Sequence, residues 1–296
     1  MYFKCKGGSG SNVTIDGVEV EEDLALSSGM MYENTSVSTL PYNFKEGSAV
    51  VYQNEIHIMG SSYNSAYKYH YKYNGDTWES VSTLPYNFYQ GGAVVYNNEI
   101  HILGGNAYKT IHYKYNGLTW EKVSDLPYNF WDGGVVVYNN EIHILGGNDT
   151  DTYQKYHYKY DGTSWSKLSN LPYYFYVGDV VIYNNEIHIL GGYNYDKRHY
   201  KYNISSSSWT SVSTLPFQLY YGSAVVLNNE IHIMGSNTSN YLKYHYKFNG
   251  STWEGLINLP HNYRMGDVVA YQGKIHLLGG ADYPTAHYTL NKNYYY

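Results

Sequence analysis

The chain has 296 residues, which is enough for one large domain or two small ones. Only 15% of the residues are charged, the net charge is −6 and Lys and Arg form no block, which argues against a nucleic-acid groove because such a groove needs clustered positive charge. Cys5 is the only cysteine, so an intrachain disulfide and a cysteine-based metal site are excluded. The 41 tyrosines and 29 glycines, without a long segment of helical period, predict an all-β protein.

The first 34 residues are expected to form an element of their own. The opening segment MYFKCKGGSGSN lacks the apolar run of a secretory signal, and no apolar run in the chain approaches membrane-spanning length. Its GGSGSN stretch is typical of a flexible linker, and VTIDGVEV over residues 13–20 predicts a small hairpin with an Asp-Gly turn. We therefore expect residues 1–34 to be a linker and attachment element, without insertion into a membrane.

From residue 35 onward the sequence consists of six similar units, each of about 44 residues. The segment NEIHIMG begins at Asn54, and its relatives begin at Asn98, Asn140, Asn185, Asn229 and Gly273. A Leu-Pro pair and a tryptophan recur at the same step. Six such repeats indicate one domain over residues 35–296, built from six copies of a single supersecondary unit.

The unit over residues 91–127 predicts four short strands. Two of its dipeptides, Asn97-Asn98 and Asn116-Gly117, favour tight hairpin turns because their residues tolerate positive φ. The expected strands are residues 91–96, 99–103, 111–115 and 120–127. The last strand ends at Leu126-Pro127, since proline cannot donate to the ladder.

Four antiparallel strands in each repeat are typical of the blade of a β-propeller. The double glycine after the second strand, the tyrosine in the third and the tryptophan that opens the fourth resemble the kelch repeat. The resemblance covers residues 35–296 and implies six blades around a central channel. Two units depart from the kelch pattern, with Gly60-Ser61 and Gly235-Ser236 in place of the glycine pair, and histidine stands where kelch strands often carry tyrosine.

The last unit lacks a fourth strand of its own. Its third strand lies near residues 286–290, and no SVSTLP segment follows. That segment occurs at residues 36–41 instead, ahead of the first unit. We therefore expect the N-terminal segment to supply the outer strand of the last blade, which removes an exposed sheet edge.

Twelve of the 13 histidines occupy two equivalent positions of the units, and only His261 stands apart. Histidine clusters raise the question of a metal site. Copies on separate blades cannot meet on one ion, because neighbouring strands lie about 4.8 Å apart and the copies ring the channel. A pair within one blade remains geometrically possible. We expect these histidines to serve packing and inter-blade hydrogen bonding, with no metal and no other cofactor.

One dipeptide of each unit varies while its flanks hardly change. It precedes the glycine that opens the first strand and reads Lys45-Glu46, Tyr89-Gln90, Trp131-Asp132, Tyr176-Val177, Tyr220-Tyr221 and Arg264-Met265. This variable pair lies on the loop from an outer strand to the next inner strand, at one mouth of the expected channel. Five of its twelve residues are Tyr or Trp, the residue types enriched at recognition hot spots, whereas drift would favour Ser, Asn, Gly and Lys.

The loop between the second and third strands is expected to open on the same face, because one strand separates the two loops. It varies as well, and its aromatic candidates are Tyr63, Tyr108, Tyr193 and Tyr195. Variable loops on a rigid scaffold are where binding residues are usually found. The candidate ligand-binding residues are therefore these four tyrosines with Lys45, Tyr89, Gln90, Trp131, Asp132, Tyr176, Tyr220, Tyr221 and Arg264.

The position after the opening glycine is expected to face the channel. It is occupied by Ser48, Gly92, Gly134, Asp179, Ser223 and Asp267. Two carboxylates on this ring suit a cation or a sugar hydroxyl, and they also raise the alternative of a sugar-processing enzyme, a glycosidase or an epimerase-like protein. A hydrated, empty pore is the simpler expectation.

Other enzyme classes associated with such propellers lack their residues here. Kelch-like copper oxidases use a tyrosine cross-linked to cysteine, but Cys5 lies outside the repeats, and sialidase-like sites use three arginines, whereas only Arg198 and Arg264 occur. The sequence therefore favours a non-catalytic recognition module for a glycan or a protein surface, with no nucleic-acid partner. An intracellular protein-interaction scaffold is a further alternative. The repeats also resemble kelch-like proteins of Firmicutes phage and prophage tails. Because the sequence shows no signal peptide and no transmembrane segment, we expect a cytoplasmic protein or part of a phage particle.

Overall fold

The computed structural model describes residues 13–15, 18–20, 31–63, 65–107, 109–149, 152–193 and 197–293. These residues form strands, turns and bends, with no helix among them. No helix of the described residues is long and apolar enough to cross a membrane. The prediction of an all-β protein is confirmed.

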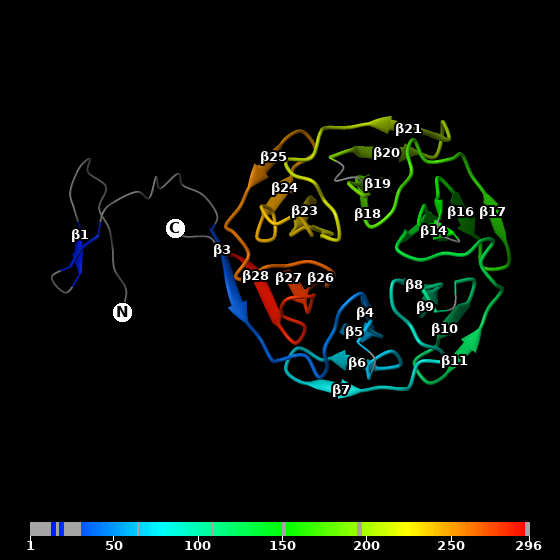
Figure 1. The fold of residues 1–296 in the computed structure, drawn as a ribbon, viewed down its shortest axis with the longest axis horizontal. Helices are drawn as coiled ribbons and strands as arrows, with labels where there is room; N and C mark the ends of the chain where they lie inside the picture. Colours follow the sequence, from blue (N-terminus) through cyan, green and yellow to red (C-terminus); the bar gives the residue numbers. More distant parts are fainter. Residues whose placement is uncertain are drawn as a thin grey trace.

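Six four-stranded antiparallel sheets stand around a common axis, as Figure 1 shows in a view along that axis. In each sheet the first strand is innermost and the fourth outermost, and the innermost strands of neighbouring blades contact one another around the whole ring. The first three blades comprise β4 (Ser48–Tyr52), β5 (Glu55–Met59), β6 (His70–Tyr73) and β7 (Trp78–Ser80); β8 (Gly92–Tyr96), β9 (Glu99–Leu103), β10 (His112–Tyr115) and β11 (Trp120–Lys122); and β12 (Gly134–Tyr138), β13 (Glu141–Leu145), β16 (His157–Tyr160) and β17 (Trp165–Lys167).

The remaining three blades repeat the same order. They comprise β18 (Asp179–Tyr183), β19 (Glu186–Leu190), β20 (His199–Asn203) and β21 (Ser208–Ser211); β22 (Ser223–Leu227), β23 (Glu230–Met234), β24 (His245–Phe248) and β25 (Trp253–Gly255); and β26 (Asp267–Tyr271), β27 (Lys274–Leu278), β28 (His287–Asn293) and β3 (Met31–Ser36). Two small two-stranded sheets complete the described structure. One joins β14 (Asn148–Asp149) to β15 (Thr152–Tyr153), and the other joins β1 (Val13–Ile15) to β2 (Val18–Val20), the segment for which a hairpin is predicted.

The first and second strands of every blade are joined by a two-residue turn. In the second blade Asn97 and Asn98 have φ values of 49° and 59°, and Gln53 and Asn54 in the first blade have values of 49° and 61°. Positive φ at both positions is the signature of a type I′ turn, whose twist matches that of the strands it joins. The turn residues therefore fix the register, in which Tyr96 faces Glu99.

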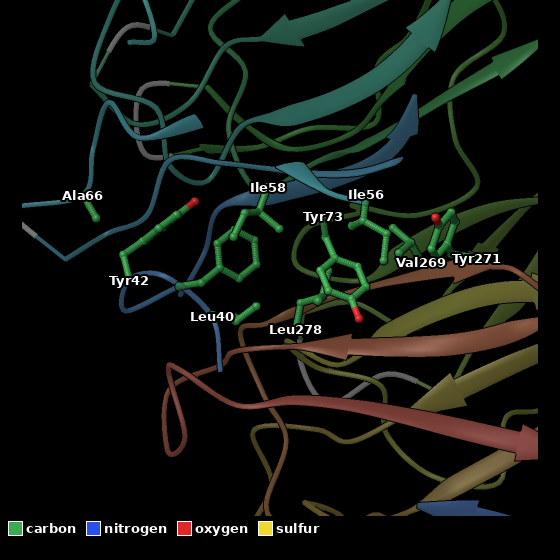
Figure 2. Close-up of a cluster of buried hydrophobic side chains, with 10 residues drawn as sticks. Leu40, Tyr42, Ile56, Ile58, Ala66, Tyr73, Val269, Tyr271 and Leu278 are labelled. Atoms are coloured by element: carbon green, nitrogen blue, oxygen red, sulfur yellow. The ribbon is translucent and has the colours of Figure 1, made fainter. Parts of the chain in front are cut away.

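The core consists of six hydrophobic clusters, one at each interface between neighbouring blades. In the cluster drawn in Figure 2, Ile56 and Ile58 of the first blade pack against Val269, Tyr271 and Leu278 of the last. The two sides of each blade thus serve two different neighbours. Because side chains alternate across a strand, Ala49 and Val51 of β4 belong to this cluster, whereas Val50 and Tyr52 belong to the cluster shared with the second blade.

The repeated histidines form one buried hydrogen-bonded pair within each blade. In the second blade Nδ1 of His101 lies 2.8 Å from Nε2 of His112. The equivalent pairs are His57–His70, His143–His157, His188–His199, His232–His245 and His276–His287. The hydrogen bond therefore lies inside a blade, which corrects the expectation of an inter-blade hydrogen bond. The inter-blade contribution is aromatic, since the ring of His112 packs against Tyr160 and Trp165 of the third blade.

The last blade is closed by the N-terminal segment, as the sequence predicts. Strand β3 pairs antiparallel with β28 along its whole length, from Ser36 opposite Tyr288 to Met31 opposite Asn293. In Figure 1 these two strands, blue and red, lie side by side although they come from opposite ends of the chain. The sheet begins at Met31, a few residues ahead of the boundary expected at residue 35.

Candidate functional site

A closed ring of backbone hydrogen bonds surrounds one mouth of the channel. The N–H group of the second residue in each variable pair donates to the carbonyl oxygen of the same residue in the preceding blade. The six N···O distances are 2.8 Å for Glu46 to Met265, 2.7 Å for Gln90 to Glu46, 2.7 Å for Asp132 to Gln90, 2.9 Å for Val177 to Asp132, 3.0 Å for Tyr221 to Val177 and 2.9 Å for Met265 to Tyr221. All six residues have positive φ, between 52° and 60°.

This ring explains why the pair can vary while its flanks do not. The second residue of each pair contributes to the ring through its backbone N–H and C=O groups, which are the same in every residue type except proline. Left-handed backbone is uncommon outside glycine, and here it is occupied by residues as different as Val177 and Tyr221. The side chains are thus released from the hydrogen-bonding role that the backbone performs.

The loops between second and third strands meet the variable pairs on the same face, as the sequence predicts. The N–H of Asn106 donates to the carbonyl of Tyr89, and the N–H of Asn237 donates to the carbonyl of Tyr220. The tyrosines themselves make contacts there. The rings of Tyr67 and Tyr89 lie 5.3 Å apart, and those of Tyr176 and Tyr193 lie 6.0 Å apart.

A second aromatic group joins the fourth and fifth blades at the mouth. The rings of Tyr220 and Tyr221 lie 4.9 Å apart, and the hydroxyl of Tyr221 lies 3.5 Å from that of Tyr176. Tyr176 also hydrogen-bonds to Asp132. Burial first, then the charge of Glu46, raises the pKa of Asp132 well above its usual value, and the hydrogen bond from Tyr176 opposes this rise.

Charged and amide side chains occupy the other part of the rim. Arg264 donates from Nε and Nη2 to the two carboxylate oxygens of Asp282, at 3.1 and 3.2 Å, and from Nη1 to Asn237. Lys45 pairs with Glu46 at 3.6 Å. These charges are therefore already partnered on the rim.

Trp131 occupies a different environment from the one expected of a sugar-stacking residue. Only 5% of its surface is exposed, and the ammonium group of Lys109 lies 3.9 Å from the centre of its ring. Its backbone bridges Asn148, the first residue of β14. Trp131 is a candidate ligand-binding residue in the sequence, but in this structure its ring offers no open stacking face, because Lys109 from the loop of the preceding blade covers it.

The other candidates fall into two groups. Tyr63 lies half-buried in the corresponding loop of the first blade. Tyr108 and Tyr195 lie outside the described residues.

Within the described part of the chain no three His, Cys, Asp or Glu side chains are placed to hold a metal ion.

Below the ring lies a cavity of about 280 Å³, lined by Ser48, Asp179, Ser223 and Asp267 among others. Each aspartate carboxylate bridges two blades. Asp179 accepts from the N–H of Val180 at 2.7 Å and from that of Ala224 in the next blade at 2.5 Å. Asp267 does the same with Val268 and with Ala49 of the first blade, both at 2.7 Å.

The two channel carboxyl groups have pKa values near neutral pH. Burial raises the pKa of Asp179 and of Asp267 to about 7, against the opposing effect of the backbone N–H groups that they accept from. The two serines of this ring are buried and bond across blades instead, Ser48 to the carbonyl of Gly91 at 3.2 Å and Ser223 to that of Gly266 at 3.4 Å. The position therefore holds blades together as well as lining the cavity.

Comparison with known proteins places the fold. No protein-family model matches the chain, and no curated protein matches its sequence. A solved structure entitled "Structure of YjhT" is similar, with a TM-score of 0.71 and 15% sequence identity over 86% of this chain and 95% of that one. At this identity the likeness shows the fold, a six-bladed β-propeller, and nothing of the ligand.

Proposed function

We propose that the protein is a non-catalytic recognition module, which binds a surface glycan through the aromatic side chains at the ring-bearing mouth of the propeller. The observation that carries the proposal is the contrast at the variable pairs. The second residue of every pair makes the same backbone hydrogen bonds in the ring, while the side chains of the pairs differ from blade to blade and are rich in tyrosine. Tyr89, Tyr176 and Tyr220 are half-buried, so part of each residue remains accessible to a ligand.

Tyrosine suits this task for a physical reason. It offers a large flat face for an apolar sugar face, together with a hydroxyl, and little conformational entropy is lost when it is fixed. The ring contacts between Tyr67 and Tyr89 and between Tyr176 and Tyr193 hold these side chains in place before any ligand arrives. Such preorganisation lowers the cost of binding.

The alternative of hydrolysis or epimerisation by the channel acids receives less support. A general acid and a general base need pKa values that are pushed apart, whereas those of Asp179 and Asp267 are raised together to about 7. Both oxygens of each carboxylate also accept a backbone N–H. These bonds give the aspartates a structural role that explains their presence without catalysis.

The resemblance of the repeats to kelch-like proteins of phage tails suggests where such a module would act. Attached through residues 1–34 to a larger particle, it would present its variable mouth to a host surface. A glycan is then the first ligand to test, and a host protein is the other outcome.

A glycan array with the intact protein tests the proposal. We expect a defined set of sugar hits that is lost in both Tyr89→Ala and Tyr220→Ala, with an affinity loss of about tenfold or more for each, because aromatic hot spots contribute on this scale. Leu118→Ser is the matched control, since Leu118 is 83% exposed in the turn between third and fourth strands, at the opposite end of the blades. Hits that survive both tyrosine changes would contradict recognition at this mouth. Capture of a host protein, lost in the same variants, would move the proposal to a protein ligand.

A further inference from the structure

The inner wall of the cavity carries six equivalent backbone N–H groups, one from each innermost strand. They belong to the second residue of that strand and point away from the neighbouring strand, into the channel. Four of them are the groups bonded by the two aspartates, namely those of Ala49, Val180, Ala224 and Val268. The other two belong to Ala93 and Val135, which also line the cavity. No acceptor for either group occurs among the described residues.

The six N–H groups fall into three pairs of neighbouring blades, and an aspartate bridges two of these pairs but not the third. Asp179 bridges the fourth and fifth blades, and Asp267 bridges the sixth and first. The third bridge, between the second and third blades, would have to come from residue 92, which is glycine. A side chain cannot simply be added there, because a Cβ on Gly92 would lie 2.2 Å from Cγ2 of Val135. The two aspartates instead face alanines, Ala224 and Ala49.

We propose that the N–H groups of Ala93 and Val135 form a binding site for the carboxylate of a small ligand that enters along the channel axis. The two existing bridges show that the equivalent N–H groups of two other pairs of neighbouring blades fit one carboxylate, with one oxygen on each blade. Both residues are half-buried on the cavity wall, and one carboxylate accepts from two such N–H groups at once through charge-assisted hydrogen bonds. The site lies on the inner wall of the cavity, which Tyr221 also lines, and its donors are backbone N–H groups rather than the tyrosine side chains of the rim.

Charge in the cavity sets the conditions for binding. Among the described residues, the titratable groups that line it are Glu46, Asp132, Asp179, Asp267 and Tyr221, with no Lys, Arg or His. A further anion is repelled when the aspartates are ionised and is tolerated when they are protonated. The pKa values of about 7 for Asp179 and Asp267 place that change near neutral pH. Binding should therefore tighten as the pH falls from about 8 to about 6, by about tenfold.

The test is a titration of the ¹⁵N-labelled protein with sodium acetate, followed by the amide signals of Ala93 and Val135, with sodium chloride at equal ionic strength as the control. We expect both signals to shift saturably with acetate and not with chloride, and more readily at the lower pH. Tyr89→Ala should leave the titration unchanged, which separates this site from the proposed rim function. Signals that stay in place, or that shift equally with chloride, would overturn the proposal.

Two variants sharpen the result. Val135→Ala opens the space beside Gly92 and keeps both N–H groups, so it should bind acetate at least as well as the parent. Gly92→Asp combined with Val135→Ala supplies the missing carboxylate from the chain itself, as Asp179 does beside Ala224. It should lose acetate binding and melt at a higher temperature than Val135→Ala alone. Equal acetate binding by both variants would contradict the site.

Discussion

Acidification to about pH 5 is expected to unfold the propeller cooperatively, because each blade buries a pair of histidines that must stay neutral. All twelve of these side chains are buried, with at most 4% of their surface exposed. A pair joined by one hydrogen bond carries one proton between its two facing nitrogens. A second proton there places positive charge in an apolar interface, against the rings of Tyr160 and Trp165 in the case of His112.

The direction of the effect follows from the folded-state pKa values. Burial lowers the pKa of five second-strand histidines from 6.5 to about 4, namely His57, His101, His143, His188 and His276. Burial, and then the partner histidine, lowers the pKa of third-strand residues such as His112 to about 3. The unfolded chain therefore binds more protons than the folded chain below pH 6.5. The contribution of the neutral histidines to stability is fully present above that pH and is lost as the pH falls through 6.5 toward 4.

On acidification the histidines lower the free energy of unfolding by more than the two channel aspartates raise it. At about pH 5.5, a histidine with these two pKa values costs about 1.4 kcal/mol, so one proton in each of five pairs costs about 7 kcal/mol. Asp179 and Asp267, whose pKa values are raised, return stability on acidification, about 2 kcal/mol each between about pH 8 and about pH 5.5. The histidines prevail, and their excess grows at lower pH until it matches a total stability of about 5–15 kcal/mol.

Circular dichroism at a series of pH values measures this transition, whose midpoint we expect between about pH 4 and about pH 5.5. Replacing a whole pair, His101→Leu with His112→Leu, should shift the midpoint to lower pH and leave stability at about pH 8 nearly unchanged, since both polar partners are removed together. His101→Leu alone should lower stability at every pH, because His112 then loses its partner. A folded protein below about pH 3 would show that the pairs accept protons without unfolding.

Much of the fold follows from local features of the sequence. The dipeptide turns, the double glycines and the apolar alternation predict the four strands of each blade, and the structure confirms their existence and order. The ends are less predictable. The fourth strand of the second blade stops at Lys122 rather than at Pro127, although the backbone beyond it still bonds, with the N–H of Leu126 donating to the carbonyl of Thr110. Leucine and proline mark the end of that bonded segment rather than the end of the strand.

The candidate site is less accessible to sequence reasoning, because its contacts exist only in the closed ring. Variation at Tyr89-Gln90 indicates a released position, but the hydrogen bond from Gln90 to Glu46 that releases it joins two blades. The covering of Trp131 by Lys109 likewise joins a loop of one blade to the next. The aspartates at positions 179 and 267 can be found in the sequence. The N–H groups of Ala93 and Val135, which no aspartate bridges, can be recognised only once the positions of the blades relative to one another are known.

Removal of the closing segment, residues 1–41, is expected to lower the melting temperature by more than about 10 °C. The deletion strips β28 of its partner along the whole of β3 and also removes the bonds from the N–H groups of Val37 and Leu40 to the carbonyls of His287 and Thr285. Leu40, only 3% exposed, leaves the cluster that joins the first and last blades. Losing one buried leucine costs about 2–5 kcal/mol by itself, so the total is large against a typical stability.

The matched control is a chain that begins at Met31, which keeps β3 and every contact named above. It should melt at the temperature of the parent, as measured by calorimetry.

The shorter chain, which lacks residues 1–41, should also associate, because β28 then presents an unpaired strand edge, and edges of this kind pair with other chains. Light scattering after size-exclusion chromatography measures that association. A peptide of residues 31–41 added to the shorter chain should restore the monomer and part of the lost stability, since it supplies the missing strand. If both chains melt together as monomers, the ring is held without its N-terminal strand, and the closure has no energetic role.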